Sequence, residues 1–142
     1  MAQVPVEASR ARRGPVTMRV PFSAASVPVV RSRLRSWLAE ANTPGETAYD
    51  ARVVITELVA NAVRHAQPLA DGTLEVAWNL HCRGLEMAVT DGGAPTRPRR
   101  VTAPAYAVGG RGMSIVEALA NRWWTEQGRT RSTVHALLST KN

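Results

Sequence analysis

Residues 57–66 read ELVANAVRHA and form the second half of a helix that we expect from about residue 46 to residue 66. Apolar residues along this helix recur at i, i+3, i+4 and i+7, the spacing that buries one helix face. They are Ala51, Val54, Ile55, Leu58, Val59 and Ala62. Pro68 stands just past the expected end, where a proline stops a helix. The pattern therefore predicts a long amphipathic helix packed against a core.

The segments on either side alternate between helical and extended periods. The expected elements are a strand at 17–22, a helix at 26–42, a hairpin of 74–80 and 85–90, a helix at 113–120 and a hairpin of 123–126 and 132–138. Helices and hairpins in this order predict an α+β fold, a two-layer α/β sandwich. We expect a mixed, mostly antiparallel sheet with the helices on one face.

The chain of 142 residues, 44% hydrophobic and 20% charged, fits one globular domain. We expect a flexible N-terminal arm at 1–16 and the domain at 17–140. Cys82 is the only cysteine, which excludes an internal disulfide and a cysteine-based zinc cluster. No apolar run reaches the ~18 residues of a membrane span, and no apolar stretch follows the N-terminal arginines as in a signal peptide. A cytoplasmic protein is expected by default.

The charge balance leaves two interpretations open. Lysine and arginine number 18 against 11 aspartate and glutamate, a net charge of +7, and Lys141 is the only lysine. An anionic partner such as nucleic acid, a phosphate group or an acidic protein surface would explain the excess. A coding bias that replaces lysine by arginine would explain it equally well.

Two polar features have ordinary structural explanations when each is taken alone. Glu57, Asn61 and Arg64 fall on one side of the long helix, beside its buried face, and a solvated flank would look the same. Asp91 follows a strand directly and precedes two glycines. A carboxylate there can accept a hydrogen bond from an exocyclic amine, but an ordinary Asp-Gly turn has the same sequence.

The segment GGRG at 109–112 leads into a helix. A glycine-rich entry leaves backbone N–H groups and the helix dipole free to bind an anion, although a simple hinge has the same composition. No lysine follows the glycines as in a P-loop. The dinucleotide-binding glycine pattern is excluded too, because a loop and not a strand precedes the segment.

The order and spacing of these features resemble the ATP site of the GHKL, or Bergerat-fold, superfamily. ELVANAVRHA at 57–66 resembles its N-box, DGG at 91–93 its first glycine box, and GGRGMSIV at 109–116 its second. The resemblance extends over about residues 17–140. Because the chain is short and shows no fused domain, it is most similar to the small anti-sigma-factor serine/threonine kinases.

The resemblance implies a role for each matching residue. Asn61 would ligate Mg²⁺ through its side-chain oxygen, an atom type that Mg²⁺ prefers. Glu57 would be the general base for a serine hydroxyl or a water. Asp91 would bind the adenine amine, and Gly93 would let the ring come close.

Further roles follow from the second glycine box and the last strand. The residues expected to surround the phosphates are Gly110, Arg111 and Gly112. Thr133 would support the adenine pocket, and residues 94–109 would form the ATP lid. His65 is expected to be a packed structural residue. Of Trp123 and Trp124, one is expected on the core side of its strand and one on the surface.

Three functions agree with these features of the sequence. The first is an ATP- and Mg²⁺-dependent serine kinase that binds an anti-anti-sigma (STAS-type) protein and a sigma factor and that can form a homodimer. The second is a non-catalytic, partner-sequestering protein of the same fold, because Pro95 replaces the second glycine of the family's first glycine box. The third, a nucleic-acid binder that uses the arginines, is the weakest, since the chain contains no nucleic-acid-binding motif.

Overall fold

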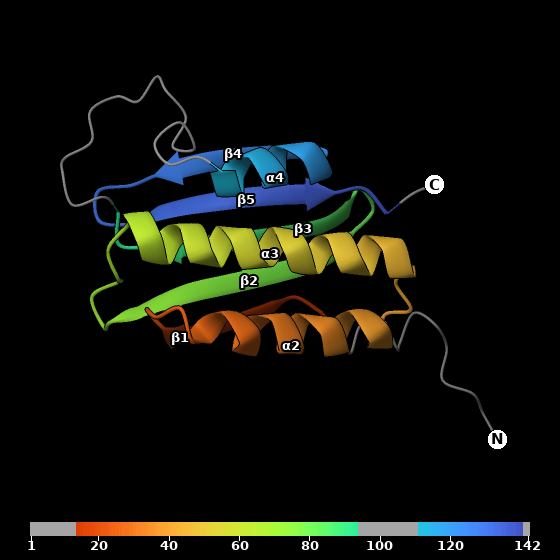
Figure 1. The fold of residues 1–142 in the computed structure, drawn as a ribbon, viewed down its shortest axis with the longest axis horizontal. Coiled ribbons are helices and arrows are strands. Elements are labelled where there is room, and N and C mark those ends of the chain that lie inside the picture. Colours follow the sequence, from red (N-terminus) through yellow and green to blue (C-terminus); the bar gives the residue numbers. More distant parts are fainter. Residues whose placement is uncertain (1–13, 94–110, 141–142) are drawn as a thin grey trace.

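Three helices cover one face of a five-stranded sheet in the part of the chain that the computed structural model describes, residues 14–93 and 111–140 (Figure 1). In chain order the elements are β1 (Val16–Pro21), α2 (Ser26–Glu40), α3 (Gly45–His65), β2 (Thr73–His81), β3 (Gly84–Asp91), α4 (Arg111–Leu119), β4 (Arg122–Gln127) and β5 (Ser132–Leu138). This two-layer α+β architecture confirms the predicted fold class, and every expected element is present. None of the described helices combines the length and apolar character that a bilayer span requires.

The strands lie in the order β1-β2-β3-β5-β4. All four pairings between them are antiparallel, whereas the expected sheet allowed mixed ones. The last strand of the chain is inserted between β3 and β4. In this register the end of β3, at Asp91, lies beside the start of β5, at Ser132.

The core lies between the sheet and the helices. All six residues that the spacing of α3 predicted to be buried are buried. Alternate residues of β2 and β3, such as Val76, Trp78 and Met87, are buried as well. The indole of Trp37 on α2 meets that of Trp78 edge to face, with ring centroids 6.4 Å apart. Aromatic pairs favour this arrangement.

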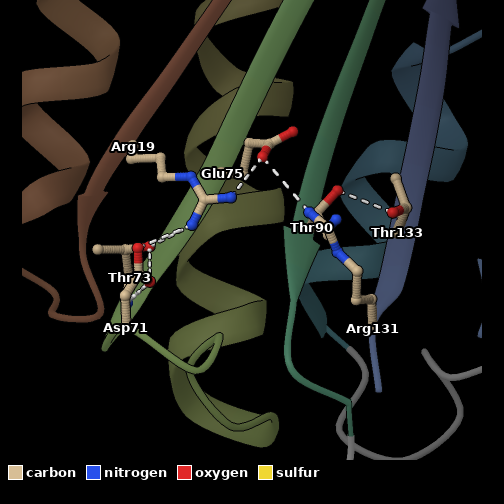
Figure 2. Close-up of polar contacts among 7 residues, drawn as sticks. All are labelled: Arg19, Asp71, Thr73, Glu75, Thr90, Arg131 and Thr133. Carbon is tan, nitrogen blue, oxygen red and sulfur yellow. Dashed lines mark hydrogen bonds and ion pairs between the residues drawn. The ribbon is translucent and has the colours of Figure 1, made fainter. Parts of the chain in front are cut away.

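The other face of the sheet carries a network of exposed ion pairs (Figure 2). Arg19 on β1 contacts Asp71 at 2.8 Å and Glu75 at 3.1 Å, and Arg131, which precedes β5, contacts Glu75 at 3.4 Å. Exposed pairs of this kind each contribute at most about 1 kcal/mol. Their alignment nevertheless identifies this face as the polar side of the sheet.

The two adjacent tryptophans of β4 divide between the faces, as the sequence predicts. Trp123 packs against the hydrophobic core. Trp124 stacks on the His135 imidazole on the polar face, with ring centroids 4.8 Å apart, and the guanidinium of Arg122 lies over its indole.

Two backbone hydrogen bonds join the end of β3 to the segment that follows α3. The N–H of Gly92 donates to the Gln67 carbonyl at 2.8 Å, and the N–H of Gln67 donates to the Gly93 carbonyl at 2.9 Å. The backbones approach so closely that a Cβ on Gly92 would collide with the carbonyl oxygen of Pro68. Glycine at position 92 is therefore a packing requirement.

We predict that Gly92→Ala lowers the free energy of unfolding by about 1–3 kcal/mol, since the added methyl must displace backbone. Gly45→Ala is the matched control, because a Cβ there meets nothing within 4 Å. Chemical denaturation of both variants measures the difference. Equal stability of Gly92→Ala and the parent would show that the two segments are not held together as described.

Candidate functional site

A cavity of about 120 Å³ lies between the C-terminal half of α3 and the neighbouring ends of β3, β4 and β5. Its polar lining residues are Asn61, His65, Asp91, Thr125, Gln127 and Ser132. The strand register places three of them in one row across the sheet, since Ser132 is paired with both Asp91 and Gln127. The cavity thus brings together residues from the predicted N-box and the first glycine box.

Asp91 is the buried acid of this cavity, with only 6% of its surface exposed. One carboxylate oxygen accepts a hydrogen bond from the N–H of Gly93 at 2.7 Å. Burial raises the pKa of Asp91 to about 6, and the Gly93 hydrogen bond only partly opposes this. A desolvated carboxyl group that lines a cavity is typical of a functional site.

Asn61 is half-buried on α3 and lines the same cavity. Within the described residues, no hydrogen bond engages its side-chain amide. Its oxygen is a ligand type that Mg²⁺ accepts, and its carboxamide nitrogen is a donor. Asn61 and Asp91 are therefore both available to a polar ligand in one cavity.

Glu57 faces a different space. It lines a groove between α2 and α3 and is not among the residues around the cavity. It precedes Asn61 by one helical turn, about 6 Å along the axis. The two side chains are therefore neighbours on the helix surface, Glu57 lining the groove and Asn61 the cavity, while Arg64 is exposed.

Thr133 lies on the polar face of the sheet, away from the cavity. Its hydroxyl shares a hydrogen bond of 2.8 Å with the hydroxyl of Thr90 on β3 (Figure 2). The structure does not bring Thr133 to the pocket that the resemblance implied, because successive side chains of a strand point to opposite faces.

The neighbouring Ser132 faces the cavity instead, and it was missed from the sequence. The alternation of β5 contains the signal that identifies it. Val134 and Ala136 point to the helix side, so the residue two positions before Val134 must point there too.

The expectation for His65 is wrong. Its side chain is exposed at the end of α3 and lines the cavity, so it is not packed in the interior. It follows Asn61 by four positions, and this spacing places the two side chains on the same side of the helix. The same i, i+4 spacing in the sequence could have added His65 to the candidate site.

The glycine boxes are described only in part. Gly93 lines the cavity with φ +93°, a backbone conformation that favours glycine. Arg111 and Gly112 form the first turn of α4. Gly110 and the expected lid at 94–109, Pro95 included, lie outside the described residues.

A family model described as a histidine kinase-like ATPase domain matches residues 20–136, most of the chain. The chain belongs to this family. The match confirms the resemblance to the GHKL superfamily. A comparison with curated protein sequences found no match to this chain.

A solved structure shares the fold of this histidine kinase-like ATPase domain. It is the crystal structure of the RsbU and RsbW domains of Rv1364c from Mycobacterium tuberculosis, with a TM-score of 0.68 over 88% of the present chain. The two sequences are 24% identical, and the present chain spans 32% of the length of that chain. At 24% identity this similarity shows that the two chains share a fold, and it shows no more than that.

ATP is the ligand that a histidine kinase-like ATPase domain implies, and the cavity residues fit it. Asp91 is a buried acceptor suited to an exocyclic amine, and Asn61 offers an oxygen suited to Mg²⁺. The cavity is smaller than the usual ~300–1,000 Å³ of a ligand pocket. From Gly93, at the edge of the cavity, the chain continues into residues outside the described part.

We predict that Asp91→Asn stabilises the ligand-free protein at pH 7 by about 1–3 kcal/mol. The folded state holds the Asp91 proton up to about pH 6, whereas the unfolded carboxyl loses it near 3.8. The stability of the parent therefore falls as the pH rises from 3.8 to about 6. Above that range the buried charge of Asp91 lowers the free energy of unfolding. Asparagine removes the charge and keeps an oxygen that accepts from Gly93. Denaturation at pH 4 and pH 7 should show the gain at pH 7 alone.

Asp71→Asn serves as the control. The side-chain hydrogen bond from Thr73 lowers the pKa of this exposed carboxyl, and Arg19 acts in the same direction. A lowered pKa means that the charged form contributes stability at neutral pH, so this variant should lose stability. If Asp91→Asn also loses stability at pH 7, the cost assigned to its buried charge is wrong.

Proposed function

We propose that this protein is an ATP-binding serine/threonine kinase of the anti-sigma-factor type. It would phosphorylate an anti-anti-sigma partner of the STAS type and regulate a sigma factor. One observation carries the proposal: α3 presents Glu57 to an open groove and, one turn later, Asn61 to the cavity that contains Asp91. The proposed proton acceptor and the proposed nucleotide site would therefore be one helical turn apart.

Each residue then has one chemical task. Asp91 accepts a hydrogen bond from the adenine amine and orients the base. Glu57 accepts the proton of the partner's hydroxyl as its oxygen forms a bond to the γ-phosphorus and the bond to the ADP oxygen breaks. Mg²⁺ held through the Asn61 oxygen would neutralise charge on the phosphates.

In a second candidate function the protein binds the nucleotide but transfers no phosphate. In the described residues Glu57 and Asn61 line different spaces, so nothing requires both to act on one ligand. A non-catalytic regulator of the same fold would bind ATP in the cavity and sequester its partner.

We predict that Glu57→Gln separates catalysis from binding. Glutamine preserves the size of the side chain but cannot take the proton, and a general base contributes about 10²–10⁴-fold in rate. The variant should bind Mg-ATP with parental affinity and transfer phosphate at least about a hundredfold more slowly. Asn61→Ala should instead lose Mg²⁺-dependent binding. Calorimetric titration and a radiolabelled transfer assay with a STAS-type partner measure both quantities.

Two results would count against the kinase. Phosphate transfer by Glu57→Gln at the parental rate would show that Glu57 is a solvated residue beside the buried face of α3 and not the general base. A parent protein that binds ATP well and transfers phosphate to no candidate partner would support the non-catalytic regulator.

We predict that adenosine affinity falls as the pH drops below about 6, because a protonated Asp91 is a poorer acceptor for the adenine amine. The loss should approach about tenfold per pH unit well below the pKa. Adenosine is used because it has no phosphate group to titrate. His65 also lines the cavity, so His65→Gln is the control and should keep the pH dependence. Affinity that is unchanged between pH 5 and 8 would show that Asp91 does not bind the base.

A further inference from the structure

A groove of about 570 Å³ lies between α2 and α3, which run side by side over the sheet (Figure 1). Each helix contributes one stripe of residues at i, i+3, i+4 and i+7. The polar members that matter here are Arg31 and Arg35 on α2, and Tyr49, Arg52 and Glu57 on α3. These residues line the surface that we call the α2–α3 groove.

The α2–α3 groove is positively charged. It contains three arginines and one glutamate, which gives 3 − 1 = +2. Arg31 and Arg35 are exposed, and in the described part of the chain none of the three arginines has an ion-pair partner. By contrast, Arg19 and Arg131 on the polar face of the sheet are both paired with carboxylates. The groove thus concentrates cationic groups that have no carboxylate partner among the described residues.

An aromatic residue forms part of the same surface. Tyr49 is 58% exposed, and the guanidinium carbon of Arg52 lies 5.8 Å from the centre of its ring. A cation–π contact of this kind holds the arginine in place at little cost. The hydroxyl of Thr56 donates to the carbonyl of Arg52 at 2.7 Å, so the Thr56 side chain is turned toward its own helix.

We propose that the α2–α3 groove binds an acidic segment of the partner protein, next to the serine or threonine to be phosphorylated. This inference rests on the proposed function, because it makes the groove the path by which the hydroxyl reaches Glu57. Guanidinium groups bind carboxylates through paired hydrogen bonds, and an extended acidic segment offers several carboxylates in succession. The groove reaches Glu57, which stands one turn before Asn61.

A peptide fits this surface better than a nucleic acid does. Single-stranded nucleic acids bind through aromatic side chains on which successive bases stack. The lining of the groove offers one aromatic ring, Tyr49, and Arg52 lies over it. Three arginines whose one neighbouring aromatic ring is covered by Arg52 favour a ligand that carries carboxylates.

The probe is a fluorescein-labelled peptide of alternating glutamates and glycines around one serine, and anisotropy measures its binding to the full chain. A peptide with lysine at every glutamate position is the first comparison. We expect the acidic peptide to bind and the lysine peptide not to bind. Binding should weaken as salt rises from 50 to 300 mM, because the charges of the groove are exposed to screening.

Arg31→Glu with Arg35→Glu is the test variant, and Arg33→Glu is the matched control on the same helix. Arg33 is also exposed but lines cavities on the other side of α2. The double variant should bind the acidic peptide at least about tenfold more weakly, and the control should change it less than about twofold. Thermal unfolding of each variant confirms that the fold is intact.

ATP titration on the same proteins separates the two proposals. Parental ATP affinity in the double variant, together with lost peptide binding, supports the groove. If the parent binds ATP and binds the acidic and the lysine peptide with equal affinity, the groove proposal is overturned and the proposed function stands. If the acidic peptide binds through Arg31 and Arg35 but ATP does not bind, the groove stands and the proposed function fails. A labelled single-stranded oligonucleotide that binds through the same arginines and displaces the peptide would overturn the choice of partner.

Discussion

The position of the candidate site depends on two backbone hydrogen bonds that Gln67 exchanges with Gly92 and Gly93. They join the chain just after α3 to the chain just after β3, so the helix that carries Asn61 and the strand that carries Asp91 end at one place. The contact is possible only because position 92 has no side chain. Gly93 then serves twice, since its carbonyl accepts from Gln67 and its N–H donates to Asp91. The cavity is therefore a product of backbone geometry as much as of the side chains that line it.

The electrostatics of the site differ on the two sides of α3. On the cavity side Asp91 is buried, and its raised pKa records the cost of removing a carboxylate from water. On the groove side the charges are those of Arg31 and Arg35, which are exposed, and of the half-buried Arg52 and Glu57. Exposed charges of this kind act mainly on the rate of encounter and on specificity. A buried carboxyl group with a raised pKa at a cavity is typical of a binding or catalytic site, which supports the proposed contact with the adenine amine.

Local periodicity was enough to predict the helices, the strands and the layers. The buried face of α3 and the division of Trp123 from Trp124 both follow from spacing alone. The order of the motifs also predicted that Asn61 and Asp91 belong to one site. It failed where an answer needed strand order or helix packing. Ser132 reaches the cavity because β5 is inserted between β3 and β4, and Glu57 faces the groove because α2 lies beside α3. The alternation within β5 indicates the face on which Ser132 lies, but no pattern within one element contains the strand order or the helix packing.

The pairing of β1 has a consequence for synthesis. Val16 lies opposite Trp78, a residue 78 − 16 = 62 positions later, and the whole α2–α3 hairpin stands between them. At about 5–20 residues per second, β1 leaves the ribosome about 3–12 s before its only neighbouring strand in the described sheet is complete. The first strand of the described sheet to be made therefore waits longer for its partner than any other strand of that sheet, and it flanks the sheet without a neighbour on its outer side. A nascent chain must keep those six residues from other strands until β2 arrives.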